Sequence, residues 1–147
     1  MAADPWVVHD KWAEKLHKGD VDTDSDTFVM RLYTSSSNIA TTSVADATSA
    51  TNEVANGNGY TTGGETVAVT VSESSGTVTF DCADAQWTAS GGSITARYAA
   101  IIDTTLTPDE VVCHALLDNT PADVTATDGN TFTVAINASG VYTVARA

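Results

Sequence analysis

The feature that most constrains the fold is a succession of short β-branched segments in the second half of the chain. Thr- and Val-rich stretches follow one another from residue 67 to residue 145, separated by turn sequences such as Ser90-Gly91-Gly92 and Asp128-Gly129-Asn130. β-Branched side chains fit a pleated sheet, while Gly, Asn and Asp favour tight turns. Many short strands with regular turns predict a mainly β protein, an antiparallel β-sandwich or jelly-roll-like fold.

The strands do not alternate with helices, so a parallel α/β fold is not expected. The expected strands cover residues 27–34, 67–73, 76–82, 86–89, 93–103, 111–118, 123–127, 131–136 and 141–145. Residues 35–50 are poor in large apolar side chains and predict a long loop. A chain of 147 residues has the size of one domain. We expect residues 1–19 to form an N-terminal arm and helix, and residues 20–147 to form the sandwich body.

One short α-helix is expected near the N-terminus, from about residue 9 to residue 18. Trp12, Ala13 and Leu16 recur at helical spacing, and Gly19 is placed to end the helix. Exposed aromatic clusters anchor protein interfaces, so this segment is a candidate for docking onto a partner. The candidate docking residues are Trp6, Val7, Val8, Trp12 and Leu16. The alternative is a helix that plugs one end of its own sandwich.

The charge of the chain is strongly negative and unevenly distributed. Six Lys and Arg residues oppose nineteen Asp and Glu residues, which gives a formal net charge of -13. The lysines all lie in the first 18 residues, where acidic residues balance them, so the rest of the chain carries the net charge. Such a body repels phosphate backbones and anionic lipids, and neither nucleic acid nor a membrane is expected as a partner. The N-terminal sequence lacks the pattern of a signal peptide.

The alternating aspartates of residues 20–26 look like a calcium loop but do not match one. Counted from Asp20, the sixth position is Ser25 rather than Gly, and the twelfth is Arg31 rather than Glu. A solvated acidic turn is the better interpretation. His9 and His17 are not at the four-residue spacing of a helical metal pair. We expect no metal site and no cofactor.

The sequence contains no recognisable catalytic motif. Cys113 and His114 are adjacent on an expected strand, so their side chains point to opposite faces. No serine lies in a Gly-x-Ser-x-Gly motif, and carboxylates are too abundant to identify a catalytic pair. We therefore predict no catalytic residues and a protein that is not an enzyme. Cys82 and Cys113 are either two reduced, buried thiols or one cross-strand disulfide.

Arg97 lies in the middle of the strand expected at residues 93–103. An arginine among so many acids favours a bidentate pair with a carboxylate, and the candidates are Asp81, Asp84 and Asp103. An inter-subunit ion pair is the alternative. Aromatic side chains also permit a carbohydrate-binding module, since sugar-binding sandwiches expose planar rings. The aromatic residues considered for that role are Trp6, Trp12, Tyr60 and Trp87.

Several short motifs together resemble a known family. They are Asp24-Ser25-Asp26-Thr27-Phe28-Val29, Asn52-Glu53-Val54, Gly59-Tyr60-Thr61-Thr62-Gly63-Gly64, Asp81-Cys82-Ala83-Asp84, Trp87-Thr88-Ala89 and Ile94-Thr95-Ala96-Arg97-Tyr98-Ala99. In this order they resemble a family of small virion structural proteins of tailed bacteriophages. The resemblance extends from about His9 to Val144. Cys82 departs from it, because a small residue such as Ala is expected there.

The resemblance implies a capsid decoration (cement) protein with a β-sandwich or jelly-roll fold. Such a protein binds the outside of the head, contacts the major capsid protein, commonly acts as a homotrimer and stabilises the head against internal DNA pressure. It is located on the capsid surface of the virion and is made in the host bacterial cytoplasm. The family has no catalytic residues to carry over. The alternatives are a receptor- or carbohydrate-binding virion module and a tail or adaptor component.

Overall fold

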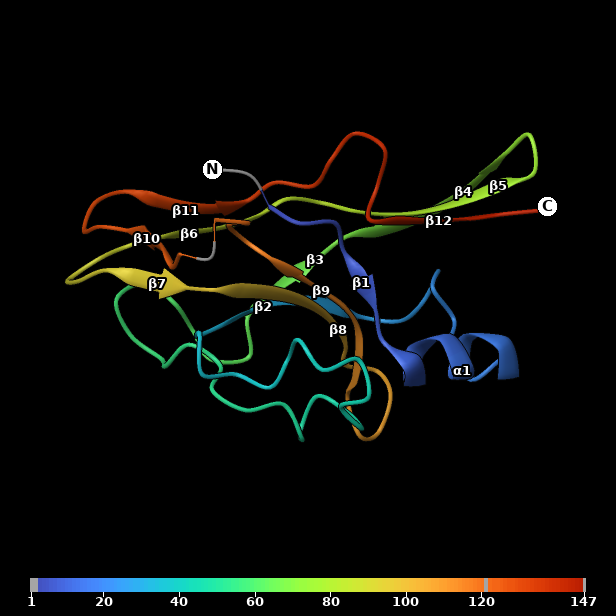
Figure 1. Ribbon diagram of the computed structural model, residues 1–147, viewed down its shortest axis with the longest axis horizontal. Coiled ribbons are helices and arrows are strands. Elements are labelled where there is room, and N and C mark those ends of the chain that lie inside the picture. The colour runs from blue at the N-terminus through green and yellow to red at the C-terminus, as the bar shows by residue number, and fades with distance from the viewer. Residues whose placement is uncertain (1–2, 121, 147) are drawn as a thin grey trace.

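The computed structural model describes residues 3–120 and 122–146, which form twelve strands and one helix (Figure 1). In chain order the elements are β1 (Val7–Val8), α1 (Asp10–Lys18), β2 (Phe28–Tyr33), β3 (Glu65–Val67), β4 (Val69–Ser74), β5 (Thr77–Cys82), β6 (Ala85–Thr88), β7 (Ile94–Ala96), β8 (Tyr98–Asp103), β9 (Glu110–Leu116), β10 (Val124–Ala126), β11 (Thr131–Val134) and β12 (Tyr142–Ala145). Every strand pair is antiparallel. The predicted mainly β architecture with one short helix is confirmed.

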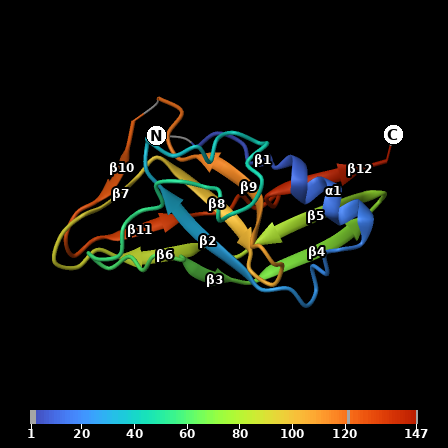
Figure 2. The same cartoon turned by 90° about the horizontal axis from the view of Figure 1, so that it is seen from below.

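The strands are arranged in two layers. One layer is a five-stranded sheet in the order β1-β9-β8-β2-β3. The other layer contains the pair β6 and β11 and the three-stranded sheet β12-β5-β4, which run along the upper part of Figure 1. The remaining pair, β7 and β10, extends from one end of the molecule, as the perpendicular view shows (Figure 2).

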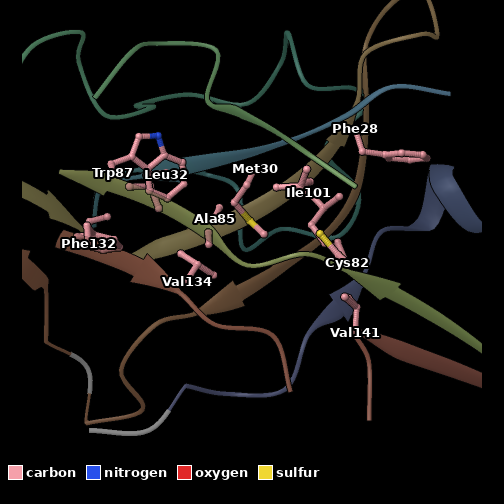
Figure 3. Packing of buried hydrophobic residues seen from close by; sticks show 14 of the residues in the cluster. Phe28, Met30, Leu32, Cys82, Ala85, Trp87, Ile101, Phe132, Val134 and Val141 are labelled. Atoms are coloured by element: carbon pink, nitrogen blue, oxygen red, sulfur yellow. The ribbon is translucent and has the colours of Figure 1, made fainter. Parts of the chain in front are cut away.

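The main hydrophobic core lies between these layers. Phe28, Met30 and Leu32 point into it from β2, as the alternation of the sequence predicted, and they share it with Trp87 and Phe132 of the opposite layer. Figure 3 shows Leu32 beside Trp87, with Phe28 towards the other end of the core. Burial of such side chains is the dominant favourable term in folding.

The helix α1 closes one end of this core. Its residue Trp12 is fully buried, and the indole ring lies edge-on to Phe28 and Phe80 at centroid distances of 6.0 and 6.3 Å. The indole Nε1–H also donates a hydrogen bond to the Tyr142 hydroxyl at 3.1 Å. Gly19 ends the helix in the left-handed conformation with a φ of 79°, where glycine avoids the steric cost of a side chain. Through Trp12, the helix therefore plugs one end of its own sandwich.

A second apolar cluster lies on the outer face of the five-stranded sheet. The loop of residues 34–50 covers this face, and its residues Ile39 and Ala47 pack against Val29 and Tyr33 of β2. The Ala47 N–H donates to the Asp109 carbonyl at 2.8 Å. The loop is irregular, as predicted, but its apolar residues cover the outer face of the sheet. Both faces of the five-stranded sheet therefore pack against apolar side chains.

The strand predicted at residues 93–103 is divided in the structure. Its first part, β7, pairs with β10, whereas its second part, β8, pairs with β2 and β9. The chain leaves one pair of strands and joins the five-stranded sheet at Arg97. Local alternation continues across this point, so a pattern along the chain does not reveal that the pairing partners change.

Candidate docking surface

The most distinctive surface of the molecule is the sheet of β4, β5 and β12, here called the wing. It extends beyond the core on the side of α1 (Figure 1). Val78 lies opposite Val144, and Phe80 lies opposite both Tyr142 and Val71. Opposite residues in a sheet share a face, so these apolar side chains lie together on one face of the wing, which also carries Glu73 opposite Val78.

Three valines at the far part of this face are exposed to solvent. The exposed fractions are 39% for Val71, 39% for Val78 and 56% for Val144. Among the described residues, only one other large hydrophobic side chain, that of Val7, is exposed to this degree. The exposed apolar side chains are thus concentrated on the wing rather than scattered, and contiguous apolar surface is typical of an interaction site.

The apolar face continues into a small groove between the wing and the N-terminal segment. The groove has a volume of about 90 Å³. Its lining residues are Leu16, Thr23, Val71, Val78, Phe80, Tyr142 and Val144. Two of these lining residues, Phe80 and Tyr142, stack their rings at a centroid distance of 4.9 Å.

The two outer strands of the wing are β12 and β4. An edge strand presents backbone N–H and C=O groups that a strand of another chain can pair with. The wing therefore combines an apolar face with edge strands, and both features suit contact with another protein.

The predicted docking residues do not form one surface. Trp12 is inside the core, and Trp6 and Val8 are partly buried against it. Val7 is 43% exposed on β1, while Leu16 lines the wing groove. The prediction of an exposed aromatic arm is therefore wrong for Trp12. The physical reason is that α1 uses its apolar side to close the sandwich.

The predicted carboxylate partners of Arg97 are also wrong. Its Nε–H donates to Asp123 Oδ1 at 2.7 Å, and both side chains are partly exposed. Asp123 immediately precedes β10, whose Val124 pairs with Ala96 of β7, so the sheet pairing brings it beside Arg97. The sequence carried no signal for this pairing because it depends on which strands are neighbours.

Asp81 and Asp84 have local structural roles instead. Asp81 Oδ1 accepts a hydrogen bond from the Cys82 N–H at 2.8 Å. Asp84, which immediately precedes β6, accepts one through Oδ1 from the Ile136 N–H at 2.8 Å, and this bond ties the start of β6 to the segment after β11. Both carboxylates satisfy backbone donors rather than a charged partner.

Asp103 is fully buried at the end of β8. Its Oδ1 accepts a hydrogen bond from the Thr105 N–H at 2.9 Å, whereas Oδ2 has no hydrogen-bond partner among the described residues. Burial, together with the nearby charge of Asp26, raises the pKa of Asp103 to about 6.

The sequence did not identify the buried ion pair of Lys15 with Glu110. The Lys15 Nζ lies 2.8 Å from Oε2 of Glu110, whose side chain is only 1% exposed. A helix and a strand 95 residues apart supply the two charges, so no short-range pattern marks them. This pair fixes the register of α1 on the end of the five-stranded sheet.

Two motifs of the phage resemblance form one hydrogen-bonded cluster. Glu53 Oε1 accepts hydrogen bonds from the Tyr60 hydroxyl at 2.8 Å and from the Gly63 N–H at 2.6 Å. The Tyr60 oxygen in turn accepts the Leu32 N–H at 3.0 Å. These residues tie the glycine-rich loop to β2, which is a structural role.

The two cysteines are free and buried. Burial raises the pKa of Cys82 to about 12 and that of Cys113 well above its ordinary value. Cys113 faces the main core, whereas His114 contacts His9, so the adjacent pair is divided between the two faces of the sheet.

The acidic turn of residues 20–26 uses its carboxylates to stabilise its own backbone. Asp22 Oδ1 accepts the Asp24 N–H, and Asp26 Oδ2 accepts the Asp22 N–H. Within residues 3–120 and 122–146, no group of three His, Cys, Asp or Glu side chains is placed to hold a metal ion. The same residues contain no helix with the length and apolarity needed to cross a membrane.

The fold and surface thus define an antiparallel β-sandwich with a projecting apolar wing. Neither a protein-family model, nor a curated protein, nor a solved structure matches this chain.

Proposed function

We propose that this protein is a bacteriophage virion structural protein, a capsid decoration protein that binds the outside of the head and stabilises it. The observation that carries the proposal is the exposed apolar face of the wing, formed by Val71, Val78 and Val144. Covering apolar surface gains about 25 cal/mol per Å² removed from water, so this face favours a bound partner over solvent.

The proposed partner is the major capsid protein. The edge strands β12 and β4 offer backbone groups for strand addition, next to the apolar face that adds side-chain contacts. The net charge of -13 disfavours contact with the packaged DNA and suits a position outside the shell. The resemblance in sequence further implies a homotrimer on the capsid surface.

The free thiols agree with synthesis in the bacterial cytoplasm. Cys82 and Cys113 are both unbonded, and disulfides are rare in proteins that mature in a reducing compartment. This supports a virion protein made in the host cytoplasm and assembled there.

A carbohydrate- or receptor-binding virion module is the second candidate, and one observation favours it. Trp6 lines an open hollow of about 560 Å³ together with Asp4 and Asn137. A planar ring beside polar groups suits a sugar. The other aromatic candidates, Trp12, Tyr60 and Trp87, are buried and offer no platform. A single partly buried ring makes this candidate the weaker one.

Immunogold electron microscopy of phage particles tests the proposal. Antibodies against the protein are expected to label the head. Labelling confined to the tail would contradict a decoration role and favour the tail or adaptor component.

Light scattering of the purified protein provides a second test. A trimer agrees with the proposal, whereas a monomer that binds glycans would favour the carbohydrate-binding module.

A further inference from the structure

Two histidines that are 105 residues apart in the chain contact each other inside the protein. His9 Nε2 lies 3.0 Å from His114 Nδ1, and the rings are perpendicular with a centroid distance of 5.1 Å. His9 is fully buried and His114 is 6% exposed. One hydrogen bond between two imidazoles needs one N–H donor and one lone pair. Two protonated rings would direct two N–H groups at each other.

The contact lies where the N-terminal arm, residues 3–9, joins the edge of the five-stranded sheet. The arm is held by the two-residue strand β1 on β9 and by hydrogen bonds from Asp4 N–H to the Leu116 carbonyl and from His9 N–H to the Val112 carbonyl. These bonds measure 2.9 and 3.0 Å. Trp12 and the pair of Lys15 with Glu110 hold α1 independently of these bonds. His9 is the N-cap residue of α1, and its carbonyl accepts the Ala13 N–H, so His9 is the hinge between the arm and the helix.

Few charged groups near the pair favour a protonated ring. Asp10, the first residue of α1, favours the charged form of His9, and the Ile39 backbone in the covering loop acts in the same direction. From β8, the Tyr98 ring lies edge-on to His114 at a centroid distance of 6.4 Å. Asp10 is therefore the carboxylate that acts on the pair.

Ionisable groups on the covering loop and on β2 have partners of their own. Asp46, in the covering loop, accepts hydrogen bonds from Thr48 and Ser49. On β2, Arg31 lies across Ala100 from His114 and pairs with Asp109 at 2.9 Å. No carboxylate among the described residues forms a salt bridge with either ring.

We propose that the His9–His114 contact is an acid-sensitive latch that holds the N-terminal arm on β9 at neutral pH and releases it when the rings are protonated. The arm contributes one side of the open hollow that is lined by Trp6, so release of the arm also removes that side of the hollow. The latch does not depend on the decoration role, because it rests on the contacts within one chain.

The direction of the pH effect follows from the burial of the rings. Burial and the mutual influence of the two rings lower the pKa of His9 to about 4, and burial lowers the pKa of His114. A released histidine has a pKa near 6.5. The released arm therefore binds more protons than the closed arm, and closure weakens as pH falls from about 6.5 towards 4. Well above a pH of about 6.5 the rings are neutral in both the closed and the released state, so closure no longer depends on pH.

Hydrogen exchange of the intact protein tests the latch. Protection factors of amides in residues 3–9 are measured between pH 7 and pH 4.5, in the presence of a chelator, and compared with those of β5. We expect the arm to lose protection by roughly tenfold or more over this range, while β5 stays protected. Constant protection of the arm, or equal loss in the arm and β5, would overturn the proposal.

Variants separate the latch from general acid sensitivity. His9→Phe and His114→Phe keep an aromatic ring but cannot take up a proton, so each is expected to reduce the loss of arm protection in acid. His17→Gln is the matched control, because His17 is exposed on α1, and it should behave as the natural protein. If neither Phe variant folds, NMR of the natural protein decides: the His9 ring must take up its proton over the same pH range in which the amides of residues 3–9 lose protection, and protonation of His9 with the arm still protected would refute the latch.

Discussion

At the residue scale, the stability of the fold depends on the pairing of the buried Glu110 carboxylate. The Glu110 carboxylate has one charged partner, Lys15, and one oxygen without a hydrogen-bond partner among the described residues. Removing one member of a buried ion pair leaves an uncompensated charge. Lys15→Ala should therefore lower the free energy of unfolding by about 3 kcal/mol, measured by urea denaturation.

Lys11→Ala is the matched control for Lys15→Ala. Lys11 pairs with Glu14 on the exposed side of the same helix, where solvent screens the charges. The urea midpoint of Lys11→Ala should equal that of the natural protein. Equal midpoints for both variants would contradict the structural role assigned to Lys15.

The buried thiols give a second prediction at this scale. Burial raises the pKa of both Cys82 and Cys113, and the thiolate is the reactive form. The native protein at pH 8 should react with a thiol reagent far more slowly than the denatured protein, which should release two equivalents. Rapid labelling of the native protein would show that a cysteine is accessible.

Arg97 illustrates how a residue is recognised in sequence while its partner is not. The strand pattern predicted a structural ion pair, but Asp123 became the partner only through the pairing of β7 with β10. Both side chains are partly exposed, so Arg97→Ala should reduce the free energy of unfolding by only about 0–1 kcal/mol in thermal or urea denaturation. A loss of several kcal/mol would indicate a buried role.

At the scale of elements, α1 is part of the core. Trp12 fills the end of the sandwich between Phe28 and Phe80. Trp12→Ala should reduce the free energy of unfolding by about 3–5 kcal/mol, because it removes a buried aromatic ring and leaves a cavity. Val7→Ala, at an exposed site on β1, should have a far smaller effect on the melting temperature.

This result changes how the N-terminal segment can be tested. Deleting residues 1–18 removes Trp12 and also the Lys15 partner of Glu110, so loss of particle binding by a truncated protein would reflect unfolding. Point substitutions on the surface are the informative experiment. A truncated chain that melts like the full chain would contradict the role of α1 as a plug.

The strands that sequence reasoning located best are those with local signals. The strands at residues 77–82 and 131–134 follow from alternating apolar residues bounded by glycine-containing turns. The neighbours of each strand could not be predicted, because pairing joins distant segments such as Thr77–Cys82 and Tyr142–Ala145. The exposure of Val78 and Val144 depends on that pairing, so the wing was not recognised as a surface.

At the scale of the whole molecule, the protein combines an acidic body with one concentrated apolar face. The negative charge favours solubility, while the wing offers a site where a partner can cover Val71, Val78 and Val144. The proposed decoration role would use both properties, since the protein must remain soluble until it reaches an assembled shell.

Binding of wing variants to phage heads that lack the protein tests this account most directly. Val144→Asp places a charge on the apolar face, whereas Thr143→Asp places the same charge on the opposite face of the same strand, where Thr143 is also exposed. With both variants folded, cosedimentation should show at least roughly tenfold weaker binding for Val144→Asp and unchanged binding for Thr143→Asp. Equal binding of Val144→Asp and the natural protein would contradict docking through the wing.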